Sequence, residues 1–236
     1  MSSIYDLYSK EKKKQMLYVG AAVALLAPFT ETTYLPALSS IRNSLSTSDS
    51  AVALTVSLYL AAVGFGQVLF GPLTDKFGRL KIIFGCLSMY EVLVIASIFA
   101  PTIEWLITLR VLLGLCISGT MVSSQSIITD IYEEKERGAA MGIYFVPILL
   151  GPVIAPLCGG ILSETFTWRS TFVLLAIMAI PIFLATALIV PETEHWHVAQ
   201  RLKMSPSKDE KTVIAIDEIK QPSLLSPWLG VAVALI

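Results

Sequence analysis

The stretch Gly71–Lys81, which reads GPLTDKFGRLK, stands between two long apolar runs of the chain. Its glycines permit a tight turn and a close approach of helices, because glycine has no side chain to obstruct either. Asp75 lies near the start of this turn, and Arg79 and Lys81 lie beside the following run. Such a cluster can form charge pairs that hold one conformation together. A turn that simply carries the basic residues usual beside a membrane is the alternative.

The composition of the whole chain is typical of a membrane protein. Of the 236 residues, 55% are hydrophobic and 15% are charged, whereas an average soluble chain has about 25% charged residues. The mean hydropathy is +0.72, and the charged residues gather between long uncharged runs. This pattern excludes a disordered chain, a nucleic-acid binder and most soluble enzymes. It predicts an all-α protein that crosses the bilayer several times.

Six apolar runs are long enough to cross the hydrocarbon core, which takes about 20 residues. They fall near residues 17–38, 51–72, 80–100, 103–124, 140–163 and 170–190. We therefore expect a cytoplasmic N-terminal segment, a six-helix membrane domain, a cytoplasmic central loop and the start of a truncated seventh helix. These four regions cover residues 1–16, 17–190, 191–226 and 227–236.

The distribution of basic residues predicts the orientation. Of the 17 lysines and arginines, all but Arg42, Arg110 and Arg169 fall before the first run, in the two even-to-odd connections or after the sixth run. Lysine and arginine in short loops favour the cytoplasmic side. We therefore expect the N-terminus to lie in the cytoplasm.

The opening stretch resembles the G-x-L-[ST]-D-[RK]-x-G-[RK] signature of the major facilitator superfamily, and every fixed position is matched. Three further motifs follow in the family's order: R-x-x-x-G in the fourth run, a D…ERG connection, and G-x8-G-x3-G-P-x2-G-G in the fifth run. Ala155 stands where the last motif has glycine. With YLPAL at 34–38, the chain is similar to the twelve-span fungal drug:proton antiporters. The later motifs rest on Arg110, Gly114, Asp130, Arg137, Gly142, Gly151, Pro156, Gly159 and Gly160.

The resemblance implies a fold and two structural roles. The fold is the six-helix N-terminal half of the major facilitator architecture, a 3+3 inverted repeat, followed by the start of a seventh helix. The fifth-run glycines and proline correspond to a motif of antiporters. The charged connections correspond to a cytoplasmic latch that helps to stabilise an outward-open state, formed here by Gly71, Asp75, Gly78, Arg79, Asp130 and Arg137.

Three ionisable residues, Glu31, Glu91 and Arg110, fall inside apolar runs. Because a charge in hydrocarbon is costly, such residues usually face a cavity or a partner. Glu31 and Arg110 each lie about 10 Å below the outer membrane surface, and Glu91 lies slightly deeper, at 1.5 Å of rise per residue. Glu91 can pair with Arg110, carry a proton or be a structural acid.

One face of the fourth helix carries Arg110, Gly114, Ser118, Met121 and Gln125, which is the pattern of a cavity wall or of helix packing. Tyr59 and Gln67 are weaker cavity candidates. By resemblance to antiporters with an acid on the first helix, Glu31 is the favoured proton carrier, with a structural hydrogen bond as the alternative. The predicted proton and substrate cavity comprises Glu31, Tyr34, Glu91, Arg110 and Gln125.

We expect a transporter that exports drugs or small organic ions by proton antiport through alternating access. The alternative is a truncated, non-transporting fragment, or a half-transporter that needs a complementary C-terminal half. The expected partners are the lipid bilayer, protons and a small-molecule substrate, without nucleic acid. No catalytic constellation or Walker A motif occurs, so neither an enzyme nor a cofactor is expected, and His195 and His197 make only a weak metal pattern. The plasma membrane is favoured over the vacuolar membrane.

Overall fold

The computed structural model describes residues 8–190 and consists, over those residues, of helices joined by short turns. The predicted all-α fold is confirmed, and six helices are long and apolar enough to cross a membrane when α1 is counted together with α2. The predicted regions 191–226 and 227–236, and the histidines in them, lie outside the described residues. The elements are α1 (Lys10–Thr32), η2 (Leu35–Ala37), α2 (Leu38–Ser44), α3 (Asp49–Phe77), α4 (Arg79–Ile98), α5 (Ile103–Ile131), α6 (Glu134–Thr165) and α7 (Arg169–Ile189).

Local sequence signals explain where these helices begin and end. The hydroxyls of Ser9, Ser48 and Thr102 each accept a hydrogen bond from a backbone N–H in the first turn of the helix that follows, which satisfies one of its unpaired donors. The Ser9 cap starts α1 at Lys10, seven residues before the predicted span. Between α3 and α4 a single residue, Gly78, reverses the chain with φ of 90°, a conformation that favours glycine.

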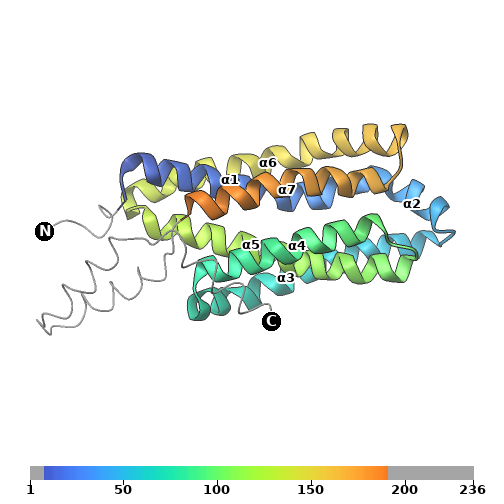
Figure 1. Cartoon of the computed structure of the whole chain (residues 1–236), viewed down its shortest axis with the longest axis horizontal. Coiled ribbons are helices and arrows are strands. Elements are labelled where there is room, and N and C mark those ends of the chain that lie inside the picture. The colour runs from blue at the N-terminus through green and yellow to red at the C-terminus, as the bar shows by residue number, and fades with distance from the viewer. Residues whose placement is uncertain (1–7, 191–236) are drawn as a thin grey trace, which may run out of the picture.

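The helices run side by side along one long axis (Figure 1), and their packing repeats. The contact of α3 with α5 matches that of α6 with α1, and the contact of α4 with α5 matches that of α7 with α1. Exchanging α1, α3 and α4 with α5, α6 and α7 therefore reproduces these pairs of neighbours. This is the arrangement expected of a 3+3 repeat.

Glycines allow the two equivalent helix pairs to approach closely. A methyl group at Gly114 of α5 would lie 2.6 Å from the Tyr59 carbonyl oxygen of α3, and one at Gly151 of α6 would lie 2.5 Å from Pro28 Cγ of α1. Gly159 of α6 lies against the backbone of Thr33 with no room for a side chain. Small residues at helix interfaces are the usual means of close packing in lipid.

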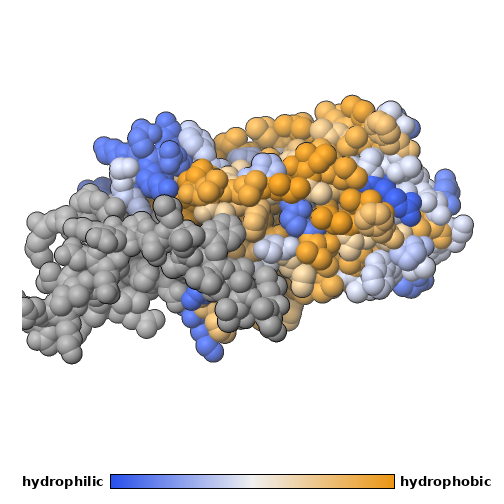
Figure 2. All heavy atoms as spheres, in the orientation of Figure 1, coloured by the Kyte–Doolittle hydropathy of each residue, from blue (hydrophilic) through white to orange (hydrophobic). Residues whose placement is uncertain are grey.

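The outer surface is largely apolar. Val68 on α3, Leu149 on α6 and Leu188 on α7 are 77%, 73% and 80% exposed. In Figure 2, hydrophobic residues cover the middle of the visible face and hydrophilic residues gather toward its two ends. A surface of this kind suits an integral membrane protein that crosses the bilayer several times.

The Gly159 contact predicts that alanine substitutions at two glycines of α6, Gly159 and Gly142, have different effects on stability. Gly159→Ala should lower the free energy of unfolding by about 1–3 kcal/mol, because the new methyl group overlaps the Thr33 backbone. Gly142→Ala, at a position in the same helix with nothing within 4 Å, should be neutral or slightly stabilising, since alanine favours helix. Thermal unfolding in detergent measures both variants. Equal effects of the two substitutions would contradict the packing described.

Candidate functional site

A fully buried arginine stands where three membrane helices meet. The guanidinium carbon of Arg110, on α5, lies 4.1 Å from the centre of the Tyr34 ring and 4.2 Å from the centre of the Tyr59 ring. Tyr34 follows the end of α1, and Tyr59 is on α3. Arg110 Nη1 donates a hydrogen bond of 2.9 Å to the carbonyl oxygen of Thr30 on α1. The two aromatic faces and the carbonyl oxygen attract the cation, whose side chain is fully buried.

The end of α1 makes the carbonyl oxygen available. The α-helix stops at Thr32 and the chain passes into η2, which contains Pro36. The last carbonyl groups of a helix have no partner within it and carry its negative partial charge. Thr30 is among these last residues, so Arg110 satisfies an orphan carbonyl and lies at the end of the helix where a cation is favoured.

A chain of hydroxyl groups fixes the residues around Arg110. The Thr30 hydroxyl donates to the Leu26 carbonyl at 2.6 Å and lies 2.6 Å from the Tyr90 hydroxyl of α4. The Thr55 hydroxyl of α3 donates to its own helix at 2.6 Å and lies 2.9 Å from the Tyr34 hydroxyl. Because both threonine protons are used within their helices, Tyr90 and Tyr34 are the donors in these pairs. The network connects α1, α3, α4 and α5.

The arginine retains unused donors. Among the described residues, Arg110 Nε and Nη2 have no hydrogen-bond partner, and no carboxylate forms an ion pair with this side chain. Glu31 is partly exposed and forms no ion pair with Arg110 within residues 8–190. Glu91 does not pair with Arg110 either, and its two carboxylate oxygens are buried with no partner in the described part of the chain. These two nitrogens, which together carry three N–H bonds at the centre of the helix bundle, can therefore still bind an acceptor.

The structure brings together only part of the predicted cavity. Arg110 and Tyr34 are in contact, and Glu31 is near them, but Gln125 is exposed on α5, 15 residues or about 22 Å along the helix from Arg110. Gly114 and Ser118, on the same predicted face, pack against α3, so the packing alternative holds for them.

The sequence reasoning underrated Tyr59 and missed Thr55 and Tyr90. The signal for all three is a hydroxyl side chain inside an apolar run, at positions 55, 59 and 90. Gln67, the other weak candidate, is exposed.

A second charged cluster lies at one end of the bundle, at the turn of Gly78 between α3 and α4. Arg79 is buried, forms an ion pair with Asp130 of α5, and lies 3.3 Å from Asp75 of α3. Its Nη1 also donates to the Ser126 carbonyl oxygen at 3.0 Å. The cluster thus joins α3, α4 and α5. Of the other predicted latch residues, Arg137 is half-buried and forms no ion pair within residues 8–190, and Gly71 has open space beside it.

The predicted antiporter motif lies on α6, which continues as one helix through Pro147, Pro152 and Pro156. Gly151 and Gly159 face α1 as described above. Gly160 makes an ordinary contact with Pro36, since a methyl group there would lie 3.9 Å from it, and Gly142 faces open space. The motif therefore contributes two close contacts with α1.

These features agree with what comparison with known proteins finds. A sequence profile of the Major Facilitator Superfamily matches residues 20–236. The chain belongs to the Major Facilitator Superfamily. Members of this superfamily are transporters of small molecules in membranes and not enzymes.

The relatives include fungal antiporters and exporters. The chain is 32% identical over 186 residues to MFS antiporter QDR3 of Candida albicans, covering 79% of this chain and 27% of that protein. It is 29% identical over 189 residues to Citrate exporter 1 of Aspergillus niger, covering 80% of this chain and 36% of the exporter. The chain therefore spans less than half the length of these relatives.

A solved structure shows the same fold. The inward-facing, occupied structure of a bacterial homologue of the human lysosomal transporter Spinster superposes with a TM-score of 0.69 at 24% identity. The match covers 78% of this chain and 46% of the homologue.

The Arg79 cluster predicts unequal effects of removing its two acids. Asp130→Asn should lower the free energy of unfolding by about 3–5 kcal/mol, because it leaves a buried arginine without its main counter-charge. Asp75→Asn should cost under about 1 kcal/mol, since the Asp75 side chain is 69% exposed. Denaturant unfolding in mixed micelles measures the difference. A larger loss for Asp75→Asn would show that the exposed pair, not the buried one, holds the cluster.

Proposed function

We propose that this chain is the N-terminal half of an exporter that moves drugs or small organic ions by proton antiport through alternating access. The observation that carries the proposal is the buried Arg110 at the junction of α1, α3 and α5, whose Nε and Nη2 have no hydrogen-bond partner in the described structure. A charge held so deep in a membrane protein is costly unless it serves a pathway or a partner. The names of its relatives, an antiporter and an exporter among them, favour outward transport.

Glu31 is the proposed proton carrier. It stands one residue after Thr30, whose carbonyl oxygen holds Arg110, and it is partly exposed where Arg110 is fully buried. Alternating access exposes the two sides of such a site in turn. An acid at this place can therefore take up a proton from one side of the membrane and release it to the other.

The Arg79 cluster and the α6 glycines are the parts proposed to take part in the rocking movement of alternating access. The Arg79 cluster with Asp75 and Asp130 is the proposed latch, since it gathers charged groups of α3, α4 and α5 at one end of the bundle. The glycines at 151 and 159 let α6 pack tightly on α1 and move with it as one body. Rocking of one such body against a second around a central site is the basis of alternating access.

The proposal also includes a complementary C-terminal half of the transporter. Because the chain spans 27% of one antiporter relative and 36% of one exporter relative, the other side of the cavity is expected from a C-terminal half. Without it, the chain is a non-transporting fragment or a half-transporter that assembles with a partner. We place the N-terminus in the cytoplasm and favour the plasma membrane, on the distribution of basic residues and on the resemblance to drug antiporters.

Transport driven by a pH gradient tests the proposal. The chain is reconstituted in vesicles with a fluorescent cationic dye, alone and with a C-terminal half from a relative, and dye movement is followed after an acid pulse. We expect movement that Glu31→Gln and Arg110→Ala reduce to the level of protein-free vesicles. Glu164→Gln, which changes an exposed acid at the end of α6, is the matched control and should retain the activity.

The outcomes separate the alternatives. Movement only when the C-terminal half is present supports the half-transporter. Movement that persists in Glu31→Gln at every pH gradient would remove Glu31 as the proton carrier. No movement in either form, with insertion shown by protease protection, would contradict export by this chain.

A further inference from the structure

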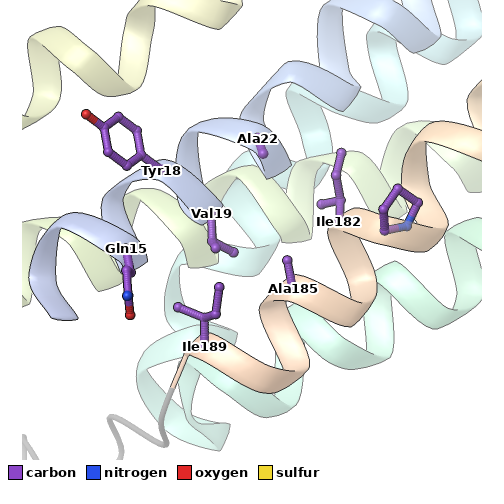
Figure 3. Close-up of a pocket in the computed structure, with 8 residues that line it drawn as sticks. Gln15, Tyr18, Val19, Ala22, Ile182, Ala185 and Ile189 are labelled. Carbon is purple, nitrogen blue, oxygen red and sulfur yellow. The ribbon is translucent and has the colours of Figure 1, made fainter. Parts of the chain in front are cut away.

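A hollow lies on the surface between α1 and α7, apart from the proposed transport site, and is lined mainly by apolar side chains. Its volume is about 350 Å³, and Figure 3 shows Val19 and Ala22 of α1 facing Ile182 and Ala185 of α7 across it. The small side chains at positions 22 and 185 leave the space open. Over most of its length the lining is apolar, and its two polar side chains, Gln15 and Tyr18, come from the N-terminal part of α1.

Basic residues continue from the polar end of this hollow. Lys12 lies about 20° from Val19 around α1, and Lys14 lies about 40° from Tyr18 at 100° per residue. Lys14 Nζ is 6.0 Å from the centre of the Tyr18 ring. Lys13 points elsewhere, since its Nζ is 6.0 Å from the ring of Tyr132 in the connection between α5 and α6. Glu11, which is exposed, is the acid within this turn of α1.

The order of these groups matches the order of groups in a phospholipid. An apolar channel lies beside the hydrocarbon of the membrane, an amphipathic tyrosine and an amide follow at its end, and two lysines lie one to two turns further along α1. Tyrosine is enriched at the level of lipid headgroups. Basic clusters next to a membrane helix attract anionic lipids, and basic pockets between helices bind their headgroups.

We propose that the hollow between α1 and α7 binds one anionic phospholipid, with an acyl chain along Val19, Ala22, Ile182 and Ala185 and the phosphate near Lys12 and Lys14. The site is separate from Arg110, and the proposal does not depend on transport. Bound lipid would connect α1, the first helix of the first repeat, to α7, the last helix of the second, and so stabilise the domain in membranes rich in anionic lipid.

Native mass spectrometry of the whole chain with equal amounts of phosphatidylserine and phosphatidylcholine tests the proposal. We expect the first bound lipid to be phosphatidylserine. Lys12→Gln with Lys14→Gln should weaken its binding about fivefold for each lysine removed. Lys76→Gln with Lys135→Gln removes the same charge from exposed positions at the same end of the bundle and should leave the binding unchanged.

A second pair of variants tests the groove itself. Ala22→Leu with Ala185→Leu fills the hollow and should abolish the selective binding, whereas Ala61→Leu with Ala139→Leu, at exposed positions on α3 and α6, should not. Circular dichroism confirms that each variant retains its helices. If Ala22→Leu with Ala185→Leu reduces the helical signal, Ala22→Leu alone serves instead.

Three results would overturn the proposal. Equal binding of the two lipids would show ordinary contact with the bilayer. Loss of binding on removing the lysines but not on filling the groove would show surface attraction only. Dimers that disappear when the groove is filled, without any lipid-bound species, would assign the hollow to a second copy of the chain.

Discussion

The placement of a charged guanidinium inside a membrane domain governs the structure around it. Arg110 is fully buried, and in hydrocarbon such a cation needs compensation from its own surroundings. It obtains this from the orphan carbonyl oxygen of Thr30 and from the faces of Tyr34 and Tyr59. The arrangement requires α1 to end at this depth, which the turn into η2 achieves, and it requires α3 and α5 to approach closely, which Gly114 permits.

The same constraint links the two repeats. Arg110 belongs to the first helix of the second repeat, and the carbonyl oxygen that it binds belongs to the first helix of the other. A polar contact between these helices remains at the centre of the bundle, while the apolar faces of α3, α6 and α7 stay outside. Directed hydrogen bonds extend from this contact to α3 through Tyr34 and Thr55 and to α4 through Thr30 and Tyr90. They leave Arg110 Nε and Nη2 without a partner among the described residues.

The sequence predicts the helices well because crossing a bilayer takes about 20 apolar residues, and this length is visible without any tertiary information. The turn at Gly78 was also visible, since few residues other than glycine adopt its conformation. The site was harder to predict. The similar depths of Glu91 and Arg110 make a pair possible, but depth does not fix the direction of a side chain around its helix. The partner that the structure shows, the Thr30 carbonyl oxygen, is a backbone atom without a signature in the sequence.

Nuclear magnetic resonance of the chain labelled with ¹⁵N-arginine tests the central claim most directly. The Arg110 signal is assigned by its disappearance in Arg110→Lys. Because the guanidinium lies over the faces of two tyrosine rings, its Nε proton should resonate well upfield of those of exposed arginines and move downfield in Tyr59→Leu. An Arg110 signal at the position of an exposed arginine, unchanged in Tyr59→Leu, would contradict the claim that this buried cation organises the fold.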